Sequence, residues 1–301
     1  MIAIVMTARF SSPRVRLLCR ITLLSLYVTC MDAISLKANS VHASARATAV
    51  ESFKVMDVLQ RANALEAMGL NVLHCEVGQP ETGAPKTVAD AAVSALLEPQ
   101  VMGYTDAFGL LDLRNKISQH YTDCYSLEKP IDPSRIVVTT GSSGGFLLAF
   151  TACFDAGDTV AIASSGYPCY RNILSALGCH LANVPINSEF KLTSRELQQE
   201  ITRRKEAGET PLRGLILSSP SNPTGAMLSP EELHDLCELC DSHDIQFLSD
   251  EIYHGISYGK PEATALSFSS KAIVLNSFSK YYSSKCSSAR APSELLRKRA
   301  L

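Results

Sequence analysis

The sequence has few charged residues, little net charge and no long apolar run. Lys, Arg, Asp and Glu make up 19% of its 301 residues and leave a formal net charge of -2. This balance offers nothing that would attract a nucleic acid or an acidic partner. The apolar run at residues 21–28 is far too short to cross a bilayer, so no membrane span is expected. A chain with 46% hydrophobic residues and this length can bury a sizeable core, in one large or two modest domains.

The ten cysteines are scattered and do not form the pattern of a disulfide framework. Such usage is typical of a reducing compartment. Cys237 and Cys240 form a single C-x-x-C, but no second pair completes a zinc site and His243 would add only one ligand. Because the two cysteines are three apart in a predicted helix at 230–243, they share a face and are expected to pack. No metal site is predicted.

Both ends of the chain differ from its body in charge. Residues 1–31 hold four arginines and no acid, and residues 284–301 are also strongly basic. The N-terminal composition suits a signal-peptide core or an organelle transit peptide, with a cleavage-like Ala43-Ser44-Ala45 nearby. The alternative is a disordered or mis-assigned leader, with Met31 as the true start. Residues 1–48 are therefore predicted to be a leader or targeting segment, and the protein is expected in the cytoplasm, or in a mitochondrion or plastid if the segment is a transit peptide.

Apolar, β-branched runs alternate with segments of helical periodicity through the body of the chain. Strands are predicted at 72–76, 135–140, 159–163, 180–185, 212–217, 245–248 and 271–275. Helices are predicted at 49–69, 84–97, 110–125, 146–154, 170–177, 194–207 and 231–243. Repeated strand–helix units predict an α/β fold, in which a mostly parallel sheet is covered by helices on both faces.

Ligands of such sheets bind beyond the carboxyl ends of the strands. Polar or glycine-rich clusters follow five of the predicted strands, at 141–144, 164–170, 218–225, 249–253 and 276–280. The glycine-rich turn at 141–145 would leave backbone N–H groups free at the start of a helix, which suits a phosphate, although a tight turn with an N-cap serine is the alternative. Lys280 follows a buried strand, where lost hydration lowers a lysine's pKa and makes its amine a nucleophile for a carbonyl. A solvated loop charge is the alternative for Lys280.

Three motifs in order resemble those of the class I/II aminotransferases, the pyridoxal-phosphate enzymes of fold type I. They are SPSNPTG at 219–225, SDEIY at 249–253 and SFSK at 277–280, and the resemblance extends from about Phe53 to Ser283. It implies that the cofactor is pyridoxal 5'-phosphate and that the reaction is transamination between an amino acid and a 2-oxo acid. The variants of these motifs resemble the subgroup that acts on aspartate, alanine or aromatic amino acids. The resemblance also implies a homodimer.

The resemblance implies catalytic roles for three residues. Lys280 matches the lysine that bonds the cofactor and moves a proton, and Asp250 matches the partner of the ring nitrogen, which lets the ring act as an electron sink. Tyr253, together with Asn222, matches the donors to the ring's phenolic oxygen. Purely structural roles are the alternative for these residues. Asp250 and Glu251 could be a helix-start acid pair, and residues 222–225 could be an ordinary turn. His254 is expected to be structural.

Further matched residues concern the phosphate, the ring face and the substrate. The phosphate site is matched by Ser142, Ser143, Gly144 and Ser277. Tyr167 resembles the aromatic residue that stacks on the ring, although it could be a core aromatic. Gly78 resembles the backbone contact to the substrate carboxylate, and Tyr104 a tyrosine given to the neighbouring subunit's phosphate.

The chain departs from the family pattern after Ser283. The family places an arginine eight residues after the lysine, where this chain has Ser288, and continues with a strand and a C-terminal domain. We therefore expect an N-terminal arm with part of the small domain at 49–100, an incomplete large domain at 101–283 and a divergent basic tail at 284–301. A C-terminally truncated chain of this kind is expected not to be a competent enzyme by itself. A fold-sharing lyase or synthase and a non-catalytic truncated product are the alternatives.

Overall fold

The computed structural model describes residues 44, 46, 50, 54–78, 80, 82–98 and 103–284. Contacts within the chain divide it into two units, Met1–Thr48 and Ala49–Leu301. The predicted leader at 1–48 lies almost wholly outside the described residues, and the tail from Lys285 onward, with Ser288, lies outside them entirely. None of the described helices is long and apolar enough to cross a membrane.

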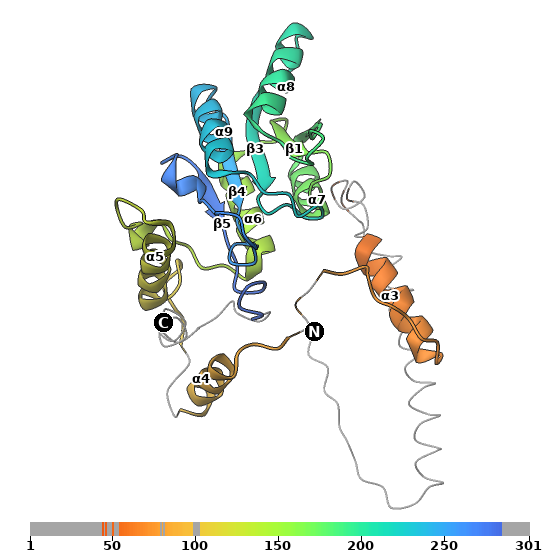
Figure 1. Ribbon diagram of the computed structural model, residues 1–301, viewed down its shortest axis with the longest axis vertical. Coiled ribbons are helices and arrows are strands. Elements are labelled where there is room, and N and C mark those ends of the chain that lie inside the picture. The colour runs from red at the N-terminus through yellow and green to blue at the C-terminus, as the bar shows by residue number, and fades with distance from the viewer. Residues whose placement is uncertain are drawn as a thin grey trace, which may run out of the picture. The chain divides into compact units, whose positions relative to one another are not determined.

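The second unit is built on a parallel five-stranded sheet (Figure 1). Its spatial order is β2-β1-β3-β4-β5. The strands are β1 (Thr159–Ala163), β2 (His180–Val184), β3 (Leu212–Ser218), β4 (Gln246–Asp250) and β5 (Ile273–Leu275). All five residues of β1 and six of the seven residues of β3 are buried, as continuous apolar strands covered on both faces should be. The predicted strands of this region are thus confirmed.

Helices cover both faces of the sheet, which confirms the predicted α/β fold. On one face, α6 (Gly141–Cys153) and α7 (Pro168–Leu177) share a core with Val160, Ile162 and Ile216. On the other face, α8 (Ser194–Glu206) and α9 (Pro230–Ser242) share a core with the alternate strand residues, such as Leu215 and Phe247. Successive strand side chains point to opposite faces, so each strand contributes to both cores. Cys237 and Cys240 of α9 are buried in the second core, as predicted.

The remaining described elements come before the first strand in the sequence, except for one that lies between β4 and β5. They are α3 (Lys54–Ala67), α4 (Lys86–Leu97), α5 (Leu111–Tyr125) and two short 3₁₀ helices, η1 (Pro133–Arg135) and η2 (Ala265–Ser267). Among the described residues, no group of three His, Cys, Asp or Glu side chains could hold a metal ion.

Two predicted strands are wrong. Residues 72–76 form no strand, and Leu73 within them is 87% exposed, so this segment buries no apolar face. Residues 136–139 are extended without forming a ladder: the Val138 N–H donates to the Phe108 carbonyl at 3.0 Å, which is a contact with a loop and not with a strand. An isolated extended segment gains nothing from its alternating pattern unless a neighbouring strand pairs with it.

The predicted glycine-rich turn at 141–145 is also wrong in form, because α6 already begins at Gly141. Glycine and serine are weak helix formers, so propensity places the start of this helix too late. Packing overrides the propensity here. A Cβ added at Gly145 would lie 3.3 Å from Leu275 Cδ2, so a residue without a side chain lets α6 lie close against the end of β5.

A second close approach occurs at the centre of the sheet. A Cβ added at Gly214 in β3 would lie 2.3 Å from the Phe154 ring, which is buried directly after α6. The absence of a side chain at Gly214 therefore makes the notch that accepts this ring.

Capping residues begin two of the helices, and residues in the left-handed conformation occupy the turns that follow three of them. Thr193 with Glu196 and Ser229 with Glu232 form capping boxes at the starts of α8 and α9. At the amino ends of the strands, the helices return to the sheet through short turns that use left-handed residues. Gly178 (φ 83°), Gly208 (φ 65°) and Asp244 (φ 52°) occupy these turns, and Gly and Asp adopt this conformation more readily than most residues.

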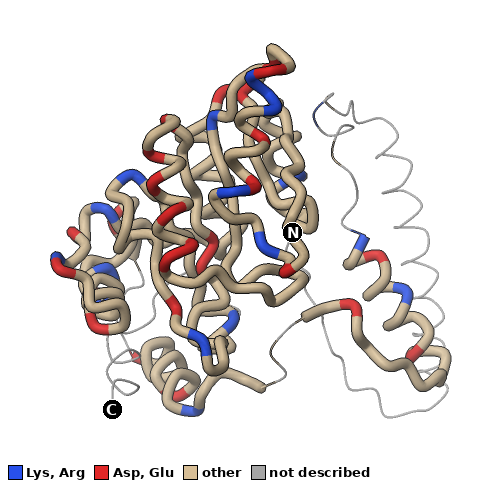
Figure 2. The backbone as a smooth tube through the Cα atoms, turned by 45° about the horizontal axis from the view of Figure 1, so that its top comes forward, with Lys and Arg blue, Asp and Glu red and all other residues tan. Residues whose placement is uncertain are grey.

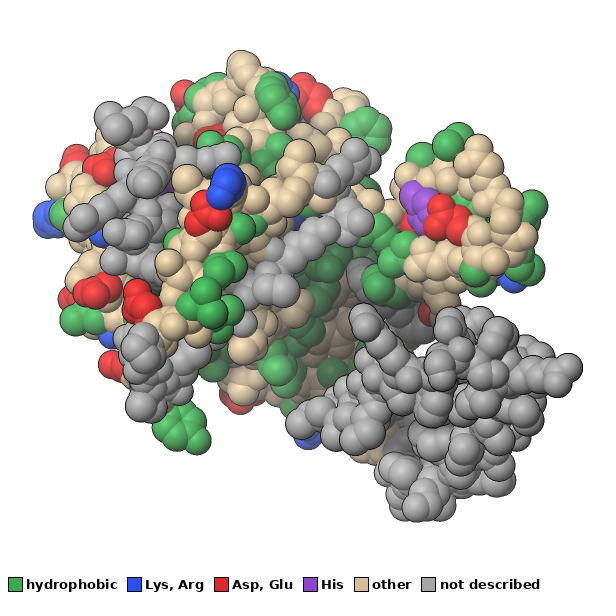
Figure 3. Space-filling view, turned by 90° about the horizontal axis from the view of Figure 1, so that it is seen from below, with side chains coloured by type: hydrophobic (Ala, Val, Ile, Leu, Met, Phe, Trp, Pro, Cys, Tyr) green, Lys and Arg blue, Asp and Glu red, His purple; other side chains and the backbone are tan. Residues whose placement is uncertain are grey.

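Acidic and basic residues are interspersed along the described helices (Figure 2). Hydrophobic side chains also reach the surface (Figure 3). Among them, Leu147 and Leu148 of α6 are each about half exposed, at 50% and 52%.

Candidate active site

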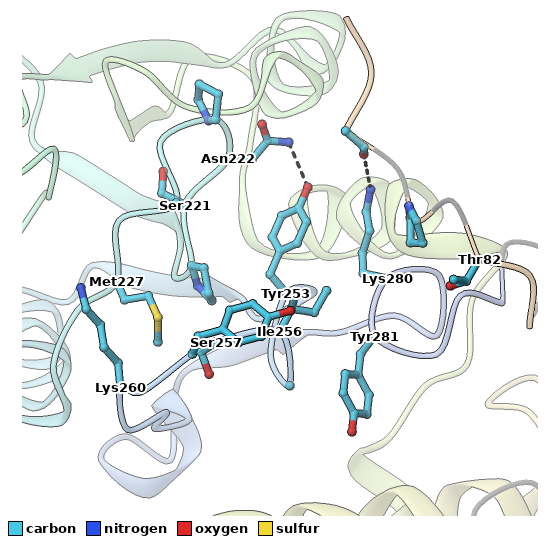
Figure 4. Close-up of a pocket in the computed structure, with 17 residues that line it drawn as sticks. Thr82, Ser221, Asn222, Met227, Tyr253, Ile256, Ser257, Lys260, Lys280 and Tyr281 are labelled. Atoms are coloured by element: carbon cyan, nitrogen blue, oxygen red, sulfur yellow. Dashed lines mark hydrogen bonds between the residues drawn. The ribbon is translucent and has the colours of Figure 1, made fainter. Parts of the chain in front are cut away.

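The segments that follow β3, β4 and β5 surround a cavity at the carboxyl edge of the sheet. Its volume is about 840 Å³, and its lining includes Gly78, Asn222, Tyr253 and Lys280 (Figure 4). The structure therefore brings four of the predicted site residues together. The lining contains two lysines, Lys260 and Lys280, and no acidic side chain among the described residues. Such a cavity favours a ligand that carries negative charge.

Lys280, Tyr253 and Asn222 form the polar centre of the cavity. The Lys280 amine lies 5.4 Å from the centre of the Tyr253 ring and donates to the Gly78 carbonyl at 3.4 Å. Asn222 Nδ2 donates to the Tyr253 hydroxyl at 3.1 Å, and Figure 4 shows Tyr253 standing between Asn222 and Lys280. Residues 222–225 are thus more than an ordinary turn, since they bring an amide to a tyrosine from a neighbouring strand end.

Asp250 is the last residue of β4 and is buried, with 1% of its surface exposed. It accepts a hydrogen bond from the Tyr170 hydroxyl and another, at 3.1 Å, from the Ile252 N–H. Burial raises the pKa of Asp250 to about 6, although these donors and the charge of Lys280 act in the opposite direction. Asp250 ends a strand and Glu251 follows it, with a turn and no helix after them, so the alternative of a helix-start acid pair is wrong.

The predicted phosphate and ring-stacking residues lie around the starts of α6 and α7, outside the set that lines the cavity. Ser143 Oγ of α6 lies 3.8 Å from Cys169 Sγ of α7, so the two helix N-termini approach one another. Tyr167 precedes α7, and its ring meets that of Tyr170 edge to face at 5.6 Å. Ser142 and Gly144 belong to the first turn of α6.

Ser277 and Tyr104 complete the predicted set. Ser277 lies in the turn before Lys280, where its hydroxyl bonds with that of Ser279 at 2.8 Å and accepts from the Ser279 N–H. Tyr104 is fully exposed and is not among the described residues that line the cavity. The structure of one chain therefore does not bring Tyr104 to the site.

Sequence reasoning missed Tyr170 as a site residue. Tyr170 lies three residues after Tyr167, which directly precedes α7, and this short spacing lets the two rings meet edge to face. The spacing was therefore a usable signal, but an interior tyrosine has many ordinary uses in a core. Burial raises the pKa of Tyr170 well above its usual value, so its hydroxyl keeps the proton that it donates to Asp250.

Comparison with known proteins places this arrangement in a family. The model of the family described as aminotransferase class I and II matches residues 71–285. Valine–pyruvate aminotransferase of Mycobacterium tuberculosis is 45% identical over 236 residues, which are 77% of this chain and 58% of that protein. Aspartate aminotransferase of Bacillus subtilis is 29% identical and is covered over 60% of its length. The chain thus spans about three fifths of these relatives.

Solved structures of aminotransferases also match this chain. A crystal structure of an aminotransferase from Mycobacterium tuberculosis matches with a TM-score of 0.73 and 44% identity, over 81% of this chain and 61% of that one. Alanine aminotransferase from Pyrococcus furiosus matches with a TM-score of 0.71 and 25% identity, over 80% of this chain and 60% of that one. The family model matches well over half of this chain, so the chain is a member of the class I and II aminotransferases.

Proposed function

We propose that the protein binds pyridoxal 5'-phosphate and transfers an amino group between an amino acid and a 2-oxo acid. The observation that carries this proposal is the Lys280 amine, which faces the Asn222–Tyr253 pair across a cavity at the carboxyl edge of the sheet. Asp250 lies buried at the end of β4, the strand between β3 and β5. The relatives named as valine–pyruvate, aspartate and alanine aminotransferases support the same reaction class.

The residues present fit this cofactor. Asp250 is a buried carboxyl whose ionised form is disfavoured by burial, and a positively charged ring nitrogen would supply the partner that favours it. Ser165, in the loop between β1 and α7, has a buried hydroxyl oxygen without a hydrogen-bond partner among the described residues. An unsatisfied buried hydroxyl in a loop beside Tyr167 is consistent with a polar group that binds there.

The cofactor, when bound, supplies an electron sink that stabilises negative charge at the carbon bearing the substrate's amino group. Lys280 would hold the cofactor covalently through its amine until the substrate's amino group displaces it. The released amine would then carry a proton to and from the substrate carbon. Asp250 would keep a proton on the ring nitrogen. Asn222 and Tyr253 would donate hydrogen bonds to the ring oxygen.

The binding of the phosphate and the assembly of two chains belong to the same proposal. The N-termini of α6 and α7, with Ser142, Ser143 and Gly144, would bind the phosphate, and Ser277 would add a hydroxyl. Tyr104 is exposed on this chain, as a residue that serves a neighbouring subunit would be. The half-exposed Leu147 and Leu148 of α6 provide apolar surface for such a homodimer.

The carboxylate common to amino acids and 2-oxo acids suits a cavity whose described lining includes Lys260, besides the cofactor lysine, and no acid. The Gly78 carbonyl accepts from the Lys280 amine at 3.4 Å, so Gly78 lies beside the lysine, and its N–H would donate to this carboxylate. The proposed substrates are an amino acid and a 2-oxo acid, of the aspartate, alanine or aromatic type that the motif variants resemble.

Trapping of the cofactor tests the proposal. Pyridoxal phosphate added to the purified chain should give a visible absorbance band, and borohydride should fix the cofactor on a peptide that contains Lys280. Lys280→Ala should abolish this trapping, whereas Lys260→Ala, which removes the other lysine of the same cavity, should not. Trapping that persists in Lys280→Ala would refute the assignment.

A half-reaction distinguishes transamination from the alternatives. An amino acid added to the loaded protein should convert the cofactor to its amine form, which a 2-oxo acid then reverses. A lyase or synthase would return the cofactor as the aldehyde. A non-catalytic chain would show neither change.

A further inference from the structure

The buried residue His254 directly follows Tyr253 and makes contacts that the proposed reaction does not use. Its side chain is 6% exposed. One ring nitrogen, Nδ1, lies 2.6 Å from the Tyr125 hydroxyl of α5, and the other, Nε2, lies 2.9 Å from the Ser219 carbonyl oxygen. The ring therefore connects α5 to the segment that follows β3.

These partners fix the protonation of the ring. A carbonyl oxygen can only accept, so Nε2 must carry a hydrogen and donate it to Ser219. Burial raises the pKa of Tyr125 well above its usual value, so its hydroxyl keeps its proton and donates to Nδ1. Burial also lowers the pKa of His254, which agrees with a neutral ring. His254 is thus a neutral imidazole with its hydrogen on Nε2.

Two adjacent residues tie the turn after β4 to the segment after β3. His254 bonds to the Ser219 carbonyl at the start of that segment, and Tyr253 accepts from Asn222 three residues further on. Tyr253 lines the cavity, whereas His254 is buried among protein groups. The same two segments are therefore joined twice, by the Asn222–Tyr253 bond at the cavity and by the His254–Ser219 bond away from it.

Glu251 anchors the other end of the same turn. It is 1% exposed and accepts from the hydroxyls of Ser249 and Thr264 and from the Ala265 N–H, at 3.0 to 3.1 Å. Its Oε2 lies 3.7 Å from His254 Nδ1. Glu262 also faces this turn and accepts from the Gly255 N–H at 2.8 Å.

From these contacts we propose that His254 is a positioning residue, whose Nε2–H bond to the Ser219 carbonyl holds Tyr253 and Asn222 in register at the cofactor's ring oxygen. This proposal deepens the proposed function and rests on it. His254 is not among the described residues that line the cavity, so it would act through Tyr253.

A matched pair of substitutions tests the bond. Glutamine at position 254 places an amide N–H near the Nε2 position and can still reach Ser219, whereas asparagine reaches only the Nδ1 position. Both variants replace the ring by a neutral amide, so they differ mainly in which nitrogen they imitate. Tyr253→Phe supplies the reference effect, and Gly214→Ala supplies a destabilised protein whose cavity residues are unchanged.

The readout is the pH at which the visible absorbance of pyridoxal phosphate bound to Lys280 changes. Donors to the ring oxygen favour its anionic form, so weaker donors should move this midpoint upward. His254→Asn should raise the midpoint by about one pH unit, in the same direction as Tyr253→Phe, and His254→Gln should remain near the unmodified protein. An unchanged midpoint in His254→Asn, or an equal shift in Gly214→Ala, would overturn the proposal.

A second readout needs no cofactor. Nitrogen resonances of the histidine rings in the isotope-labelled chain, assigned by their loss in His254→Gln, should show a neutral ring with its hydrogen on Nε2 at neutral pH. A hydrogen on Nδ1, or a doubly protonated ring, would overturn the proposal even if no cofactor binds. Failure of the proposed function itself is distinguishable, because the unmodified protein would then show no visible band.

Discussion

Asp250 should make the stability of the ligand-free protein depend on pH, and Asp250→Asn should remove that dependence. Burial raises the pKa of this carboxyl from its ordinary 3.8 to about 6. The folded protein therefore holds the proton more tightly than the unfolded chain. The stability that this gives is fully present below pH 3.8 and is lost as the pH rises through 6.

The magnitude follows from these two values. Between pH 5 and pH 8 the Asp250 contribution to the free energy of unfolding falls by about 1.4 kcal/mol. Glu251, whose pKa burial raises from 4.5 to about 7, should lose about 2.5 kcal/mol over the same range. Asparagine at position 250 has no proton to lose, and its amide oxygen can still accept from the Ile252 N–H. The variant should therefore keep the Glu251 contribution and lose only that of Asp250.

Urea unfolding at pH 5 and pH 8, followed by circular dichroism, measures the difference. Any constant cost of the amide cancels, because only the change between the two pH values is compared. Asp123→Asn, the same chemical change on the exposed side of α5, should follow the unmodified protein. A full pH dependence retained in Asp250→Asn would refute the reasoning, since the titrating group would then lie elsewhere.

Two further substitutions test the packing and the hydrogen bonding around the site. Gly214→Ala should destabilise the fold by about 1–3 kcal/mol, because its Cβ would overlap the Phe154 ring, whereas Gly83→Ala, with no atom within 4 Å of the new Cβ, should have little effect on thermal unfolding. Equal melting temperatures in these two variants would contradict the inference that the Phe154 ring needs a residue without a side chain at position 214. Tyr170→Phe should cost about 1.5–3 kcal/mol at pH 8, where Asp250 is ionised, and less at pH 5, where it is protonated. An equal loss at both pH values, measured by urea unfolding, would mean that the hydroxyl does not stabilise the anion.

Much of the sheet could be predicted because its strands are buried on both faces. The runs at residues 160–163 and 214–217 contain no polar side chain, and this composition is typical of central parallel strands. Residues 135–140 carry a similar local pattern but form no ladder, since strand formation depends on a partner that no local window contains. The start of α6 was missed for a related reason: the contact of Gly145 with Leu275 joins residues 130 positions apart.

The site residues likewise separate into those that the sequence could indicate and those whose role depends on distant partners. The clusters that contain Lys280, Asn222 and Tyr253 could be predicted because each follows a strand at one edge of the sheet. The resemblance to the family motifs then singled out these three residues, and the cavity gathers them. Tyr170 and His254 could not be assigned, because their importance lies in the partners they meet, Asp250 and the Ser219 carbonyl. A buried tyrosine or histidine looks the same in a sequence whether or not it supports a reactive residue.

The two ends of the parallel strands have consequences for how this protein can be changed. At the amino ends, helices return to the sheet through short turns fixed by residues such as Gly178 and Asp244, and none of the described residues of these turns lines the cavity. At the carboxyl ends, longer segments line it. Loop exchange at the carboxyl ends could therefore alter ligand choice while the sheet keeps its register. A reporter domain or an affinity tag is better inserted near Gly208, where the backbone is exposed and remote in the chain from the residues that line the cavity.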